Sequence, residues 1–301
     1  MAVHISGLCL GWTKSDRKPG RTKNVPLNPV PSLSEALSSF STVIVTGGSS
    51  GIGKSFIELM AKLNPGLQFC NLSRREPALK ICDIKLNHFP GDLSRPDELA
   101  RAAGAIEAFL ADAAPTGRVL LINNSGFGAY GRFPEPNLEH QLELIDVNIR
   151  GLVDLTGRLL PLLKARGGAI INVASTAAFQ PTPYMATYGA SKAFVLHWSL
   201  ALNEELRGSG VSALAVCPGP TTTDFSKRAG LRSGSVPPAL SMTCEQVVLG
   251  SLRALAAGRS QVVNGWKNKT MTFVTAKLPK PLMARAAAKA LGSYQVKQVR
   301  K

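Results

Sequence analysis

The sequence predicts an α/β fold in which helices cover both faces of a parallel sheet. Two observations predict it. From Thr42 onward, short β-rich runs alternate with longer helical runs, and a glycine-rich turn follows the first of the short runs. With 45% apolar and 18% charged residues in 301, the chain also has enough apolar material for a substantial core. We expect one domain over residues 42–265, a flexible extension over 1–41 and a basic C-terminal tail over 266–301.

The strands are predicted from short runs rich in Val, Ile and Leu, and the helices from longer runs whose apolar residues recur every three or four positions. The expected strands span residues 43–45, 67–72, 88–89, 118–123, 169–174, 211–217 and 261–263. The expected helices span residues 52–63, 96–111, 138–163, 185–207 and 244–257. Strands that alternate with helices in this way form a doubly wound sheet, which binds ligands at the carboxyl ends of its strands.

The first 40 residues combine basic residues with four prolines and lack the apolar run of a secretory signal, so we expect a flexible extension. The five cysteines are scattered and never spaced as CxxC. We therefore expect neither a disulfide framework nor a metal site, and a reducing, cytoplasmic location. No run reaches about 18 apolar residues, so any membrane contact would be peripheral.

Residues 246–301 carry eleven Lys or Arg and no Asp or Glu, most of the net charge of +16. A solvated basic tail explains this charge most simply. A second interpretation is a basic amphipathic segment that rests on an anionic membrane surface, because apolar and basic residues interleave there. The apolar residues are Leu278, Leu282, Met283, Ala286, Ala290 and Leu291, and the basic ones are Lys277, Lys280, Arg285 and Lys289. Nucleic acid is not expected as a partner, because no aromatic stacking platform accompanies the charge.

The glycine-rich turn spans Thr46–Gly53 and lies between the first strand and the first helix. Glycines permit a tight turn, and backbone N–H groups at the positive end of a helix bind a pyrophosphate. In this position the turn predicts a dinucleotide site rather than an ordinary loop. The residues expected at this site are Gly47, Ser49, Ser50, Gly51, Ile52 and Gly53.

About twenty residues later, Ser73 and Arg74 stand where an acidic residue commonly holds the ribose 2′-hydroxyl of NAD. A hydroxyl and a guanidinium instead favour a 2′-phosphate, so we expect NADP(H) over NAD(H). The alternative is that Arg74 and Arg75 only solvate a loop. Asp92 is expected either to bond the adenine amino group or to cap the following helix.

Tyr188 and Lys192 lie four residues apart in an expected helix and therefore share one face. A nearby ammonium lowers the pKa of a phenol, so Tyr188 is expected to exchange a proton near neutral pH. Ser175, at the end of an expected strand, is placed to hydrogen-bond the same reacting oxygen. Asn148 lies within the long helix, where an amide is expected to open the helix locally and hold a water that completes a proton path to Lys192.

Together with the loop Asn123–Gly126, these motifs resemble the short-chain dehydrogenase/reductase family over about residues 42–264, with a Rossmann-type fold. The resemblance implies Tyr188 as catalytic acid/base and Lys192 as the residue that lowers its pKa and holds the nicotinamide ribose. It implies that Ser175 polarises the carbonyl and Asn148 supports the water relay. For the cofactor it adds Asn124 beside the adenine-side ribose, and Pro218, Gly219, Thr221 and Thr223 near the nicotinamide carboxamide.

The expected function is an NADP(H)-dependent oxidoreductase that interconverts a carbonyl and an alcohol on a largely hydrophobic small molecule. An apolar set is expected to line the substrate site: Phe127, Phe133, Phe179, Tyr184, Met185, Phe225 and Leu231. One alternative is a nucleotide-bound regulatory or membrane-docking protein of the same fold. Another is an epimerase or dehydratase, disfavoured because no separate C-terminal substrate domain is apparent. The resemblance further implies a homodimer or homotetramer.

Overall fold

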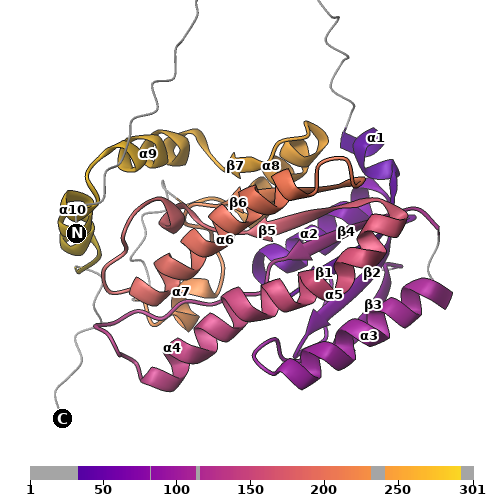
Figure 1. Cartoon of the computed structure of the whole chain (residues 1–301), viewed down its shortest axis with the longest axis horizontal. Helices are drawn as coiled ribbons and strands as arrows, with labels where there is room; N and C mark the ends of the chain where they lie inside the picture. The colour runs from indigo at the N-terminus through magenta and orange to yellow at the C-terminus, as the bar shows by residue number, and fades with distance from the viewer. Residues whose placement is uncertain (1–32, 82, 113–115, 232–240, 293–301) are drawn as a thin grey trace, which may run out of the picture. The chain divides into compact units, whose positions relative to one another are not determined.

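The computed structural model describes residues 33–81, 83–112, 116–231 and 241–292. These form a seven-stranded sheet in the order β3-β2-β1-β4-β5-β6-β7, and every neighbouring pair is parallel (Figure 1). The strands are β1 Phe40–Thr46, β2 Gln68–Ser73, β3 Lys85–Pro90, β4 Arg118–Asn123, β5 Gly168–Val173, β6 Val211–Cys217 and β7 Gln261–Val263. The predicted doubly wound fold is confirmed. Because β2 and β4 flank β1 on opposite sides, a crevice forms where the chain leaves β1 and β4.

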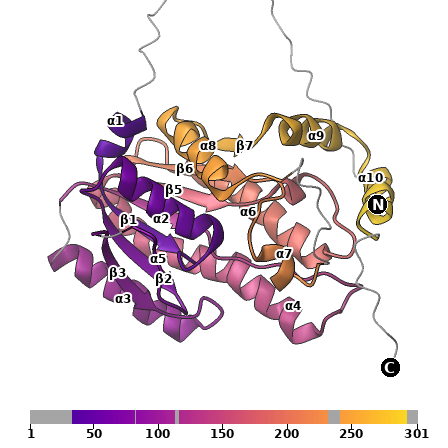
Figure 2. The same ribbon diagram turned by 180° about the vertical axis from the view of Figure 1, so that it is seen from behind.

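Helices cover both faces of the sheet, as the two opposite views show (Figures 1 and 2). The helices on one face are α1 Leu33–Ser38, α2 Gly51–Leu63 and α8 Cys244–Ala256; those on the other are α3 Pro96–Asp112, α5 Gly151–Arg166 and α6 Ala186–Glu205. Along β1, Val43 and Val45 enter the first core while Ile44 enters the second. Successive side chains of a strand point to opposite faces, so strands covered on both sides become almost continuously apolar.

The folded part of the chain begins earlier than expected. Residues 33–41, which the sequence assigned to the extension, form α1 and the start of β1. Leu37 is only 1% exposed and packs with Phe40 in the core shared by α2 and α8. The rest of the predicted extension, residues 1–32, lies outside the described residues. Within the described ranges, no helix has the length and apolarity needed to cross a bilayer.

Two other segments differ from expectation. The expected helix 138–163 is divided into α4 Leu138–Ile145, a π-helical turn η1 at Asp146–Arg150, and α5. In the predicted tail, the chain forms two further helices, α9 Trp266–Lys277 and α10 Lys280–Gly292. Two short helical turns complete the fold, η2 Thr176–Phe179 after β5 and α7 Phe225–Arg228 after β6.

Candidate active site

A cleft of about 1100 Å³ lies at the carboxyl ends of the strands. Its lining reaches from Arg74, which follows β2, to Thr223, which follows β6. All of the predicted site residues line this cleft except Gly53 and Asn148, which lie directly behind its wall. Residues more than a hundred positions apart are thus brought together at one edge of the sheet.

The glycine-rich turn is fixed against the loop that follows β4. Thr46 Oγ1 accepts hydrogen bonds from the backbone N–H groups of Asn124 and Ser125, each at 3.0 Å. The Asn124 amide donates to the Thr46 carbonyl at 2.9 Å. Gly47 has a φ of +68°, which favours glycine, and Gly53 leaves no room for a Cβ beside the Asn124 amide. The turn is therefore held rigidly at the start of α2.

The N-terminus of α2 opens onto the cleft and presents backbone N–H groups there. Ser50 is extended and makes no side-chain cap bond to the helix, so the first N–H groups of α2 keep their capacity to bind an anion. Arg228 of α7 donates to Ser50 Oγ at 3.3 Å and brings a further positive charge to this turn. Sequence reasoning missed Arg228, because it lies 178 positions from Ser50 and carries no motif of its own.

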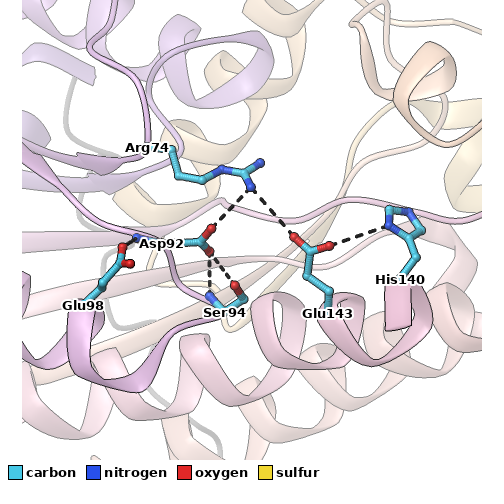
Figure 3. A network of polar contacts seen from close by, with 6 residues as sticks. All are labelled: Arg74, Asp92, Ser94, Glu98, His140 and Glu143. Carbon is cyan, nitrogen blue, oxygen red and sulfur yellow. Dashed lines mark hydrogen bonds and ion pairs between the residues drawn. The ribbon is translucent and has the colours of Figure 1, made fainter. Parts of the chain in front are cut away.

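Arg74 lies between two carboxylates at the end of the cleft next to β2 (Figure 3). Its Nη1 is 3.4 Å from Asp92 Oδ2 and 3.8 Å from Glu143 Oε1, and its side chain is 67% exposed. Burial acts to raise the pKa of Asp92, but two hydrogen bonds from Ser94 and the charge of Arg74 outweigh it, so the pKa is lowered. His140 in turn lies 3.7 Å from Glu143. The sequence did not identify Glu143 or His140, which α4 contributes.

Two predictions at this end change in detail. Asp92 does not cap α3; its carboxylate accepts from Ser94 within the turn that precedes the helix. Ser73 is buried, and its hydroxyl accepts from Asn71 at 2.8 Å and donates to the Arg75 carbonyl at 2.7 Å. The Ser73 hydroxyl is therefore already engaged within the protein, whereas Arg75 is exposed and lines the cleft.

Tyr188 and Ser175 meet at the opposite end of the cleft. Tyr188 lies in the first turn of α6 and lines the cleft beside Ser175, which follows β5. Desolvation raises the pKa of Tyr188, and the polar interaction with Ser175 only partly opposes this. Lys192 is not among the groups that lower this pKa, contrary to expectation. The ring of Phe225, 5.2 Å away between centroids, contributes to the apolar surroundings.

Lys192 lies one helical turn after Tyr188 and is buried. Its Nζ donates to the Val173 carbonyl at 2.8 Å. Burial lowers the pKa of Lys192 to about 8, although the neighbouring Cys217 acts to raise it. Because burial disfavours the charged form, the amine loses its proton far more easily than an exposed lysine does.

Asn148 lies in the π-helical turn and makes three hydrogen bonds. Its Nδ2 donates to the Phe127 carbonyl and to Ser191 Oγ, both at 3.0 Å, and its Oδ1 accepts from Phe127 N–H at 3.1 Å. The expected local opening of the helix at Asn148 is present as this π turn. The amide thereby joins α6 to the loop after β4.

The substrate end of the cleft is only partly lined as expected. Of the predicted apolar set, Phe127, Met185, Phe225 and Leu231 line it. Phe133 is an exposed loop residue, and Phe179 packs against a core cluster. Leu291 of α10 also lines the cleft, a position that no local pattern in the sequence indicates. These differences arise because loop and tail residues reach the cleft only through tertiary packing.

Comparison with known proteins agrees with this arrangement. The family model for short chain dehydrogenase matches residues 41–233. A serine 3-dehydrogenase of Agrobacterium fabrum is 31% identical over 191 residues, which are 62% of this chain and 74% of that protein. A Burkholderia cenocepacia short chain dehydrogenase solved with NADP has a TM-score of 0.68 and 28% identity, covering 82% of this chain and 97% of that one. A Sphingobium yanoikuyae short-chain dehydrogenase solved with NADPH has a TM-score of 0.64 and 27% identity, and the match covers 87% of this chain and 98% of that one. The chain belongs to the short-chain dehydrogenase/reductase family of oxidoreductases.

Proposed function

We propose that the protein is an NADP(H)-dependent oxidoreductase that interconverts a carbonyl group and an alcohol on a largely hydrophobic substrate. The main support is one juxtaposition. The phenol of Tyr188 and the hydroxyl of Ser175 line the same cleft as the glycine-rich turn and the exposed Arg74. Such a cleft can hold a long anionic cofactor and present a proton donor at its far end.

The residues of the cleft fit a dinucleotide phosphate. The turn and the open N-terminus of α2 would hold the pyrophosphate, with Arg228 beside them. Arg74 and Arg75 would hold a 2′-phosphate, rather than Ser73, whose hydroxyl is engaged inside the protein. Lys192 would hold the nicotinamide ribose. The bound NADP and NADPH of the two solved relatives support this choice. When bound, a reduced nicotinamide supplies the hydride.

Tyr188 supplies the proton in this proposal. Negative charge develops on the substrate oxygen during reduction, and the phenol donates its proton to that oxygen while Ser175 hydrogen-bonds it. Because the pKa of Tyr188 is raised, the phenol keeps its proton at neutral pH and is ready to act as an acid. The protonated phenol is the form that carbonyl reduction needs.

Asn148 acts as a positioning residue in this proposal. Its hydrogen bonds to Phe127 and Ser191 hold the loop after β4 against α6, next to Lys192. The water relay through Asn148 remains a prediction, as do the homodimer or homotetramer and the cytoplasmic location. Light scattering on the purified chain measures the oligomeric state.

The lining supports a substrate with a hydrophobic body. Phe127, Met185 and Leu231 line the cleft together with Leu291 from α10. The Agrobacterium relative acts, by its name, on serine, which is small and polar. A site for such a substrate needs polar groups to bind both its charges, whereas apolar side chains recognise a body by its area and shape.

The experiment compares wild-type and Tyr188→Phe protein with NADPH and NADH, using a panel of aldehydes, ketones, quinones, steroids and acyl thioesters. We expect the wild type to consume NADPH in preference to NADH. The Tyr188→Phe variant should lose about 10²–10⁴-fold in turnover. It should still bind NADPH in a fluorescence titration. Turnover that survives this substitution would reject Tyr188 as the proton donor.

A further inference from the structure

The helix α9 turns polar residues toward the protein and apolar residues toward solvent. Asn268, Thr272 and Thr275 are its buried side chains. They bond to the local backbone: Asn268 Nδ2 donates to the Asn264 carbonyl at 2.8 Å, and Thr272 Oγ1 donates to the Asn268 carbonyl at 2.9 Å. None of the large apolar side chains of α9 is fully buried, and Met271 is the most covered of them at 41% exposed.

Those large side chains are on the opposite side of the helix. Trp266 is 74% exposed, Phe273 67% and Val274 47%. Residues 266, 270, 273, 274 and 277 share one side of a helix with 3.6 residues per turn, and we call this side the α9 outer face. Single exposed apolar residues are ordinary, but a helical side with Trp and Phe mostly in water marks a surface that binds something.

The charge around the α9 outer face is positive. Lys267 Nζ lies 5.8 Å from the centroid of the Trp266 ring, and Lys277 Nζ lies 5.7 Å from that of Phe273. Lys269 flanks the other edge of the face, and residues 246–301 contain no Asp or Glu. Aromatic rings interleaved with lysines are typical of helices at a membrane surface, where the rings enter the headgroup region and the amines remain among the phosphates.

The next helix, α10, also exposes apolar and basic side chains. On the exposed side of α10 lie Leu282, Arg285 and Lys289, which are three or four residues apart in sequence. Both views show α9 and α10 at the opposite end of the fold from α3 and β3 (Figures 1 and 2). Of the apolar residues in the predicted amphipathic pattern, Leu291 lines the cleft, and Ala287, which lay outside that pattern, is the buried residue of α10.

We propose that the α9 outer face docks on an anionic lipid bilayer. Charge complementarity selects this occupant. In a symmetric contact with a second copy, the same surface would meet itself and place lysines against lysines. A nucleic acid would bind the lysines, yet it would gain little from Val274 or Leu282, whereas a bilayer satisfies the charges and the apolar side chains together.

The inner side of α9, opposite the outer face, adjoins the cleft. Asn268 packs so closely on Gly219 that residue 219 has no room for a Cβ. Tyr130 Oη donates to the Leu291 carbonyl at 2.6 Å, and Leu291 lines the cleft. Docking would thus bring the substrate end of the cleft close to the bilayer. The docking itself does not depend on the proposed reaction, and its test measures binding alone.

The test is co-sedimentation of the full chain with vesicles of phosphatidylcholine alone or mixed with phosphatidylglycerol. We expect binding to the anionic vesicles and a blue shift of Trp emission. Two double variants, Trp266→Ala/Phe273→Ala and Lys269→Glu/Lys277→Glu, should each weaken binding by about tenfold or more. Leu142→Ala and Lys62→Glu, which change exposed residues on α4 and α2, should leave it unchanged. Thermal melts verify that each variant is folded.

Three results would overturn the proposal. The first is equal binding to neutral and anionic vesicles, or none to either. The second is vesicle binding that both double variants retain. The third is evidence for a different occupant of the α9 outer face. A second copy of the chain would be indicated if light scattering showed a dimer that Trp266→Ala/Phe273→Ala dissociates. A nucleic acid would be indicated if the protein bound a single-stranded oligonucleotide through Lys269 and Lys277 but did not bind vesicles. Trp266→Phe removes the fluorescent indole but keeps an aromatic ring at position 266. This variant should therefore show a smaller shift of Trp emission and still sediment with the anionic vesicles.

Discussion

The ammonium of Lys192 and the amide oxygen of Asn148 converge on the backbone of Gly126. A Cβ atom on residue 126 would lie 3.2 Å from Lys192 Nζ and 2.9 Å from Asn148 Oδ1. The absence of a side chain at this one position therefore lets a residue of α6 and a residue of the π turn approach the same loop. That loop follows β4, whose end forms one side of the crevice.

Gly126→Ala should reduce turnover while the protein stays folded, because the methyl group would displace either Lys192 or the Asn148 amide. We expect at least a tenfold fall in kcat, since small misplacements in an active site are costly. The matched control is Gly104→Ala on the exposed side of α3, where no atom lies within 4 Å of the added carbon. That change should raise stability by about 0.5–1 kcal/mol and leave turnover unaltered. Equal kinetics in the two variants would contradict the crowding at Gly126.

Arg74 should make the protein prefer NADPH to NADH, and the carboxylate of Glu143 should weaken this preference. Removing the guanidinium with Arg74→Ala removes a charge-assisted contact, so we expect KM for NADPH to rise roughly 10- to 100-fold while KM for NADH changes little. Glu143→Gln removes a carboxylate that competes for Arg74 at 3.8 Å, so KM for NADPH should fall, by up to about fivefold. Steady-state kinetics with both cofactors measure these effects, and a parallel change for NADH would argue against a 2′-phosphate contact.

The pH dependence of reduction should follow Lys192. Its pKa of about 8 means that the cation is present below that pH and lost above it. Tyr188, whose pKa is raised, keeps its proton over the same range. We therefore expect kcat/KM for carbonyl reduction to be level below about pH 8 and to decline above it. Lys192→Arg, which does not titrate in this range, should abolish the decline in whatever activity it retains.

Lys192 should also make stability rise with pH. Its pKa is about 8 in the folded protein and 10.5 as a model value, so between these values the unfolded chain binds more protons. The free energy of unfolding from this group therefore increases from about pH 8 to 10.5. Below pH 8 both states are protonated, and the cost of burying the charge is fully present. Denaturant titrations at pH 7 and pH 10 measure the free energy of unfolding of wild type and Lys192→Met. At pH 7 we expect the wild type to be the less stable of the two. At pH 10 its deficit relative to Lys192→Met should be smaller or reversed.

Leu37 tests where the folded domain begins. If residues 33–41 belong to the core, Leu37→Ala should lower the free energy of unfolding by about 2–5 kcal/mol. If they belong to a flexible extension, the substitution should have no effect. Lys62→Ala, at an exposed position near the end of α2, is the control. Urea unfolding monitored by circular dichroism distinguishes the two outcomes.

The fold was predictable because its signals are local. The alternation of runs, the turn at Thr46–Gly53 and the spacing of Tyr188 and Lys192 each depend on residues close in sequence. Leu37 was missed because three apolar residues in a Pro-rich, basic segment carry too little periodicity to indicate a helix. Its burial depends on α8, which lies two hundred positions further along the chain.

The amino-acid sequence by itself determined the doubly wound sheet, the position of the dinucleotide turn and the excess of positive charge after residue 246. The tertiary structure alone decided that Glu143 approaches Arg74, that Ser73 is engaged by Asn71, and that burial raises the pKa of Tyr188. It also decided which side of α9 faces water. The physical reason is that dielectric environment, hydrogen-bond competition and exposure are set by neighbours from distant parts of the chain, and local patterns carry no record of them.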